Sequence, residues 1–231
     1  MNSINKTARM AGLFYFIFIL ASIVADLLGH FVFADVSGTI NHIMTHPLQF
    51  RMGVLISMFS YVLFFLAAWY LYNLLRSINK NTALLFLLLN LGGFAILVYS
   101  HLNLFASLNL LSGADYLKVF QADQLQAQAT LFINAFHYGS TIAQIPFGVW
   151  LLPLGFLVFK SGFLPKILGI LLIIDCFTLL ISVLQHFLLP DWKIISYPAW
   201  GIGFIAECGL ALWLLIKGVK VQKPALAEVQ K

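Results

Sequence analysis

The sequence predicts an all-α, polytopic membrane protein with six transmembrane helices and both termini in the cytoplasm. Hydrophobic residues make up 61% of the 231 positions and charged residues 9%, and the mean hydropathy is +0.96. A soluble domain usually carries about 25% charged residues, so most of this surface must face lipid. The length suits one transmembrane domain over residues 1–231, with no room for a separate soluble domain.

Six apolar stretches are long enough to cross a bilayer, since a spanning helix takes about 20 apolar residues. The expected spans are 9–34, 51–75, 82–111, 129–159, 165–189 and 197–219. Their apolar runs are continuous rather than alternating, which argues against a β-barrel. Several exceed the hydrocarbon thickness, so we expect tilted helices or helix ends that protrude.

The basic residues give the orientation. With the N-terminus inside, the inner segments hold ten of them: Lys6, Arg9, Arg76, Lys80, Lys160, Lys166, Lys217, Lys220, Lys223 and Lys231. The outer segments hold Arg51, Lys118 and Lys193. Short loops rich in Lys and Arg stay in the cytoplasm, which predicts an inner-membrane protein with both ends inside. These cations form no basic run or face, so the net charge of +5 does not predict nucleic-acid binding.

The first span carries a polar face. Ser22, Asp26 and His30 follow an i, i+4 spacing, which places them on one side of a helix. A carboxylate beside an imidazole can relay protons or orient a metal ligand, and a pair that satisfies itself near the interface is the alternative. Arg51 opens the second span, where it either snorkels to headgroups or is the counter-ion of Asp26 or Glu207.

Polar residues also interrupt the third and fourth spans. The third carries Asn90 and His101. In the fourth, polar or small residues recur every three or four positions: Thr130, Asn134, His137, Thr141, Gln144 and Gly148. Such a face cannot point at acyl chains, so it predicts either a polar seam between helices or a cavity that holds water or a ligand.

The last two spans each carry an acid. Asp175 lies near mid-membrane, where an ionised carboxylate is costly unless it is paired or wet. Glu207 is the one glutamate inside an expected span, and Gly201 and Gly203 lie above it, where they would admit another backbone or a ligand. Each acid is a candidate for function or for an interhelical hydrogen bond.

The topology places most of these polar residues at similar depth, above an inner half that is almost purely apolar. The sequence therefore predicts a pocket that opens to the outside, with eight candidate residues: Asp26, His30, Arg51, His101, Asn134, His137, Asp175 and Glu207. Three of them, Asp26, His137 and Glu207, are also candidate ligands for a divalent metal.

Three functions stay open at this point. The first is a protein that binds or transports a small molecule, a proton or a lipid headgroup, and we expect a homo-oligomer because six spans are few for a transporter. The second is an intramembrane hydrolase whose metal activates water against a lipid. The third is a non-catalytic assembly or sensor protein. Nucleotide-binding and thiol-redox motifs such as G-x-x-x-x-G-K-[ST] and C-x-x-C are absent from the sequence.

Four stretches carry a family resemblance: Ala8–Leu13, His137–Gly139, Ser161–Pro165 and Glu207–Leu214. In their order and spacing, the chain resembles a family of small bacterial membrane proteins called domain of unknown function 4386. The resemblance covers nearly the whole chain and implies a multi-pass helical membrane protein with no established activity. It also implies an acid in the first span where Asp26 stands, and Asp in place of Glu leaves its role open.

Overall fold

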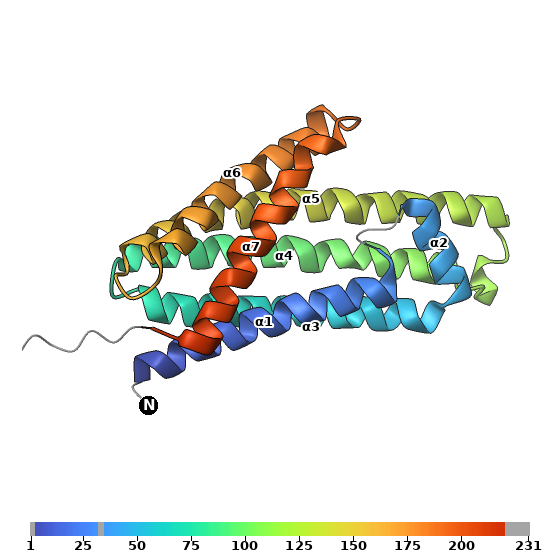
Figure 1. Cartoon of the computed structure of the whole chain (residues 1–231). Helices are drawn as coiled ribbons and strands as arrows, with labels where there is room; N and C mark the ends of the chain where they lie inside the picture. The colour runs from blue at the N-terminus through green and yellow to red at the C-terminus, as the bar shows by residue number, and fades with distance from the viewer. Residues whose placement is uncertain (1–2, 32–34, 220–231) are drawn as a thin grey trace, which may run out of the picture.

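The computed structural model describes residues 3–31 and 35–219 (Figure 1). Within these ranges the regular structure is helical throughout: α1 (Ser3–Gly29), α2 (Val36–Thr45), α3 (Pro47–Leu75), α4 (Lys80–Leu110), η1 (Asp115–Leu117), α5 (Ala122–Lys160), α6 (Lys166–Leu188), η2 (Lys193–Ser196), α7 (Tyr197–Leu212) and the π-helical turn η3 (Trp213–Lys217). Six of the described helical segments are long and apolar enough to cross a membrane, with η2, α7 and η3 forming the sixth. The expected all-α fold with six spans is confirmed.

The helix boundaries differ from the expected spans for local reasons. α1 ends at Gly29 rather than at residue 34, because His30 has a φ of 50°, a left-handed conformation that does not continue a helix. The rest of that expected span, residues 32–34, lies outside the described residues. α5 begins seven residues before the expected start, because Gln121 and Gln124 form a capping box ahead of two polar turns. Hydropathy does not detect polar turns of this kind.

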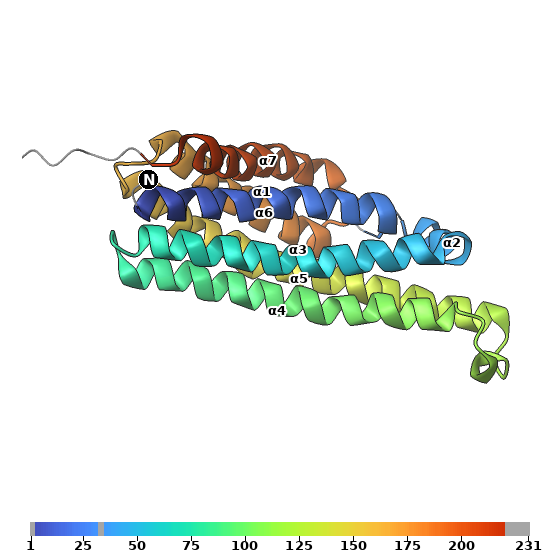
Figure 2. The same ribbon diagram turned by 90° about the horizontal axis from the view of Figure 1, so that it is seen from below.

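The six spanning helices form a closed ring. Each packs on its neighbours in the order α1, α3, α4, α5, α6 and α7, and α7 returns to α1. α3, α4 and α5 run side by side, whereas α6 and α7 form a hairpin that is inclined to them (Figure 1, Figure 2). Ser3 and Val219 lie at the same end, where the backbone N–H of Val219 donates to Asn5 Oδ1 at 2.9 Å. We call this the terminal end, and the opposite end, which α2 covers, the α2 end.

Glycines allow the closest helix crossings in the ring. A Cβ on Gly12 of α1 would lie 2.7 Å from the carbonyl oxygen of Ala211 in α7. A Cβ on Gly155 of α5 would lie 2.7 Å from the carbonyl oxygen of Gly169 in α6, and the reverse distance is the same. Small residues at such points let backbones touch, which is how membrane helices gain packing energy without a hydrophobic drive between them.

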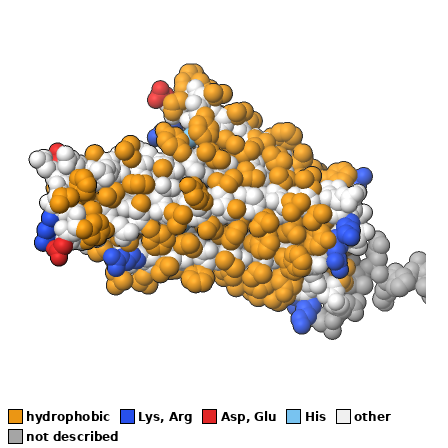
Figure 3. Space-filling view, turned by 180° about the vertical axis from the view of Figure 1, so that it is seen from behind, with side chains coloured by type: hydrophobic (Ala, Val, Ile, Leu, Met, Phe, Trp, Pro, Cys, Tyr) orange, Lys and Arg blue, Asp and Glu red, His pale blue; other side chains and the backbone are white. Residues whose placement is uncertain are grey.

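The surface matches a bilayer environment. Hydrophobic side chains cover much of the length of the bundle, and Lys and Arg gather towards its ends (Figure 3). α5 has 39 residues and is therefore about 58 Å long, against about 30 Å for a hydrocarbon core. Its first residues, in the range 122–127, are mostly exposed and include Asp123, Gln124 and Gln126, so the helix projects beyond the lipid at the α2 end.

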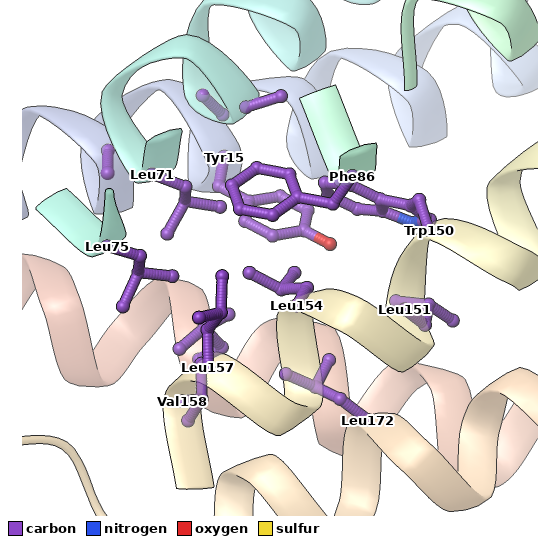
Figure 4. Packing of buried hydrophobic residues seen from close by; sticks show 14 of the residues in the cluster. Tyr15, Leu71, Leu75, Phe86, Trp150, Leu151, Leu154, Leu157, Val158 and Leu172 are labelled. Atoms are coloured by element: carbon purple, nitrogen blue, oxygen red, sulfur yellow. The ribbon is translucent and has the colours of Figure 1, made fainter. Parts of the chain in front are cut away.

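A large apolar cluster fills the ring towards the terminal end. Tyr15 lies within it and is fully buried, among Phe86, Trp150 and Leu154 (Figure 4). A second, smaller cluster lies towards the α2 end, around Phe31. The two clusters fix the depth of the polar groups described next.

Candidate functional site

The first and last spanning helices are joined by a hydrogen bond. The hydroxyl of Tyr15 in α1 donates to Glu207 Oε2 in α7. The two residues come together because α7 crosses α1 at Gly12, one turn from Tyr15, and Ala211 lies one turn from Glu207. Both side chains therefore point into the crossing rather than towards lipid.

Asp175 of α6 lies beside this pair, and its carboxylate makes no hydrogen bond of ordinary length and angle within the described residues. It is 0% exposed, and neither carboxylate oxygen has a partner among the described residues. Gly203, one turn before Glu207, makes room for it, because a Cβ there would lie 3.0 Å from Asp175 Oδ1. Asp175 therefore faces α7 one turn from Glu207. We call Tyr15, Asp175 and Glu207 the acid cluster.

Aromatic rings surround the Tyr15 side of the acid cluster. The centroid of the Tyr15 ring lies 5.5 Å from that of Phe64, 6.2 Å from that of Phe18 and 6.4 Å from that of Trp150. Figure 4 shows the Tyr15 ring near Phe86 and Trp150. One turn from Phe86, which packs on Trp150, Asn90 of α4 is 0% exposed, and neither of its amide atoms has a partner in the described structure.

His101 belongs to a separate network nearer the α2 end. Its Nδ1–H donates to the carbonyl of Leu97 at 2.9 Å, and its Nε2 lies 3.0 Å from the hydroxyl of Ser57. That hydroxyl lies 2.9 Å from the hydroxyl of Tyr61. The rings of Phe31 and Phe136 each pack edge-to-face with the His101 ring, and His101 is 0% exposed. A Ser–His contact of this kind can activate a hydroxyl, but here no substrate could reach it without movement of the rings.

The far end of the expected polar stripe of α5 packs on α6. Beside His137, the ring centroid of Tyr138 lies 6.1 Å from that of His186 in α6. Gly148, at the far end of the stripe, packs on Leu179 and Leu180, one turn from Asp175. Thr130, Asn134, His137 and Thr141 are all partly buried and Gln144 is exposed, so the stripe is neither sealed in the core nor turned fully to lipid. The stripe runs from the α2 end down to the level of the acid cluster.

A hollow of about 400 Å³ opens at the head of this stripe. It lies between α2 and α5, and Ser37, Asn41, Asp123, Gln126 and Thr130 are among the residues that line it. None of the eight candidate residues lines it. Thr130 is the point where the hollow meets the α5 stripe.

The remaining candidates lie at the α2 end of α1 and α3. His30 is exposed, and its ring centroid lies 4.4 Å from that of His42 in α2, which in turn lies 5.2 Å from that of His46. Asp26 is partly buried, one turn beyond Ser22, which bonds to Ser60 at 3.2 Å. Arg51 is exposed on α3, thirteen residues before Phe64 and thus about 20 Å from the level of Tyr15, so it is not the counter-ion of Glu207.

The candidate metal ligands are not brought together. In residues 3–31 and 35–219, no three His, Cys, Asp or Glu side chains are arranged to hold a metal ion. The reason is depth along α1. Glu207 meets this helix at Tyr15, and Asp26 lies eleven residues further on, about 16 Å away. His137 lies on α5, next to Tyr138, whose ring packs on His186 of α6. The trio of Asp26, His137 and Glu207 is therefore not a metal centre in this structure.

Sequence reasoning missed Tyr15, Ser57 and Tyr61. One signal was present in the sequence, because Tyr15 and Tyr61 fall at the middle of their helices. Tyrosines of membrane proteins gather at the interfaces, so a tyrosine at mid-span marks a hydroxyl with a partner inside the protein. The sequence does not say which partner, since that depends on how the helices rotate about their axes.

Comparison with known proteins agrees with the fold. The family model described as "Domain of unknown function (DUF4386)" matches residues 10–218. An uncharacterized protein of the archaeon Archaeoglobus fulgidus is 37% identical over 91 residues, which cover 39% of this chain and 53% of that protein. The chain thus spans about half the length of this relative. No solved structure matches. Because the family model spans most of the sequence, the chain belongs to the DUF4386 family of multi-pass membrane proteins.

Proposed function

We propose that this protein binds a small ligand or a proton on the acid cluster and that the ligand comes from the side of the membrane where α2 lies. The observation that carries this proposal is the state of Asp175. Its carboxylate is buried beside a second acid and makes no hydrogen bond of ordinary length and angle within the described residues, and the nearby hydroxyl of Thr178 donates to the backbone carbonyl instead. A charged side chain at mid-membrane costs roughly 2.5–3.5 kcal/mol by insertion scales, so unpaired acids there are retained mainly for ligand or proton pathways.

The α5 stripe supports a route to the acid cluster. It begins at Thr130, in the hollow between α2 and α5. It ends at Gly148, which packs on Leu179, and Leu179 lies one turn of α6 from Asp175. The positive-inside pattern favours the terminal end in the cytoplasm, which would turn the α2 end and its hollow outwards. Asn134 and His137 would line this route. Asp26, His30 and Arg51 would lie at its rim.

The competing functions have less support. A metal-dependent lipid hydrolase requires ligands that converge, and the described residues offer no such group. An assembly or sensor protein held by a polar seam would account for the enclosed His101 network. It would not account for an acid without a partner beside Glu207. A homo-oligomer stays part of the proposal, and a detergent-corrected mass measurement would check it.

A hydrophobic carbodiimide tests whether the acids take up protons within the membrane. Dicyclohexylcarbodiimide adds to a carboxyl that holds its proton, and the N-acylurea that forms is seen by intact mass. We expect one label per chain on the protein in lipid nanodiscs, with a rate that falls as the pH rises. Asp175→Asn combined with Glu207→Gln should remove the label. The controls Asp26→Asn and Asp123→Asn should keep it.

Two results would overturn the proposal. One is labelling that persists unchanged in the double variant, and the other is no labelling of the wild-type chain between pH 5 and pH 8. Proteoliposomes that enclose a pH dye then separate binding from transport. Proton uptake driven by a potassium gradient with valinomycin, and lost in the double variant, would indicate passage across the bilayer. A labelled protein without uptake would be a binding protein.

A further inference from the structure

The acid cluster has more acceptors than donors. Tyr15 supplies one O–H to Glu207, and both oxygens of Asp175 are left without a donor in the described structure. The hydroxyl of Thr178, one turn away, donates to the backbone carbonyl of Asp175 at 3.1 Å. A proton on Asp175 would turn one of its oxygens into an O–H donor and leave the other oxygen as an acceptor without a partner.

The helices that build the cluster bring no cation to it. The nearest Lys or Arg residues along α1, α6 and the sixth span are Arg9, Lys166 and Lys217, which lie six residues from Tyr15, nine from Asp175 and ten from Glu207. These separations correspond to about 9–15 Å along a helix. The helices that carry the cluster therefore place no Lys or Arg beside the two acids.

Aromatic rings lie on the Tyr15 side of the acid cluster. The Phe64 and Trp150 rings pack on Tyr15, and the faces of such rings attract cations. On the α7 side, Gly203 presents bare backbone to Asp175. Towards the α2 end of α7, Gly201, Phe204 and Ile205 are exposed on the outer face of the bundle.

On these grounds, which rest on the proposed function, we infer that the ligand of the acid cluster is a primary ammonium compound with an apolar body. Its N–H groups would donate to Asp175 and Glu207, and its body would lie against the aromatic rings. A quaternary ammonium carries charge but no N–H donor, and an alcohol carries a donor but no charge. Neither compound should therefore bind to the acid cluster in place of the primary ammonium.

Protection from the carbodiimide tests this inference with 2-phenylethylamine as the probe on the full chain in nanodiscs. We expect saturating amine to slow labelling at least fivefold. 2-Phenylethanol and the N,N,N-trimethyl analogue of the amine should change the rate by less than twofold. In Asp175→Asn, Glu207 should still label but lose protection. Gly203→Ala, whose Cβ would crowd Asp175 Oδ1, should weaken protection several-fold in a chain that remains folded by gel filtration.

The outcomes distinguish the ammonium ligand from the proton-binding function on which it rests. Equal protection by the amine and the alcohol would overturn the ammonium ligand, as would full protection in Asp175→Asn. Labelling that is specific and pH-dependent but indifferent to the amine would also overturn it, while the proton-binding function would stand. If the wild-type chain shows no site-specific labelling, both the ammonium ligand and the proton-binding function are overturned.

Discussion

The phenol of Tyr15 donates a hydrogen bond to the carboxylate of Glu207, 192 positions away in the sequence. This contact joins α1 to α7 and closes the ring of spanning helices. It also places a hydroxyl, a bonded acid and an unbonded acid in one region of the bundle. The predictions below test this contact and the packing that creates it.

Tyr15→Phe removes the hydroxyl and keeps the ring. We expect the free energy of unfolding to fall by roughly 0.6–1.7 kcal/mol, the range of interhelical hydrogen bonds in membranes. Unfolding in mixed micelles with increasing dodecyl sulfate measures it. Tyr70→Phe is the matched control, because Tyr70 also lies on the α1–α3 interface, where its ring stacks on Phe14. Equal effects of the two substitutions would mean that the bond to Glu207 contributes nothing.

Asp175→Asn should stabilise the protein. A buried carboxylate without a partner opposes folding, so its replacement by a neutral amide is expected to raise the free energy of unfolding by about 1 kcal/mol. Thermal unfolding in detergent at pH 8 measures the change, with Thr178→Val as a control on the same helix. A clear loss of stability in Asp175→Asn would show that the carboxylate has a structural partner, and the site assignment would fail.

Gly12→Ala should open the crossing of α1 and α7. The new Cβ would lie 2.7 Å from the carbonyl oxygen of Ala211 and 2.9 Å from the carbonyl carbon of Leu214. Both are backbone atoms, so relieving the clash requires the two helices to move apart. We expect a loss of about 1–3 kcal/mol in unfolding free energy. Gly92→Ala is the control, since the nearest atom, Pro146 Cβ, lies 4.0 Å from its Cβ position. If both substitutions are equally mild, the crossing is looser than described.

Ser57 and His101 should be energetically coupled. In a double-mutant cycle with Ser57→Ala and His101→Leu, we expect a coupling of about 1 kcal/mol, because each single change strands the polar partner in a closed site. A cycle of His101→Leu with Thr141→Val should be additive, since Thr141 donates to the backbone of His137 on its own helix. Additivity in the first cycle would contradict the network.

The His42 side chain should hold α2 against α1. The His42 Nε2 lies 2.8 Å from the carbonyl oxygen of Leu28 near the end of α1, and the rings of His30 and His46 flank the His42 ring. His42→Ala removes the contact with Leu28, so hydrogen exchange of residues 36–45 should quicken. His46→Ala, which leaves that contact in place, is the control, and equal exchange rates in the two variants would contradict the role of His42.

Most of the fold could be predicted from the sequence, and less of the site. Long apolar runs determine which segments cross the bilayer, so all six spans were found, although the polar turns of α5 and the end of α1 at His30 were not. Asp175 and Glu207 stood out because acids are costly in lipid. Their partner, Tyr15, did not, because hydropathy gives a residue's depth but not the direction it faces. Pairing depends on that direction, which the glycine crossings set.

The Tyr15–Glu207 contact also orders the events of biosynthesis. A ribosome releases α1 into the bilayer long before it translates Glu207, and until α7 arrives Tyr15 has no acid to bind. Asp175 enters the bilayer in the preceding span, without the helix that will cover it. A nascent chain that stalls after α6 would thus expose a carboxylate to lipid, a mark by which membrane quality-control proteases could recognise unfinished copies.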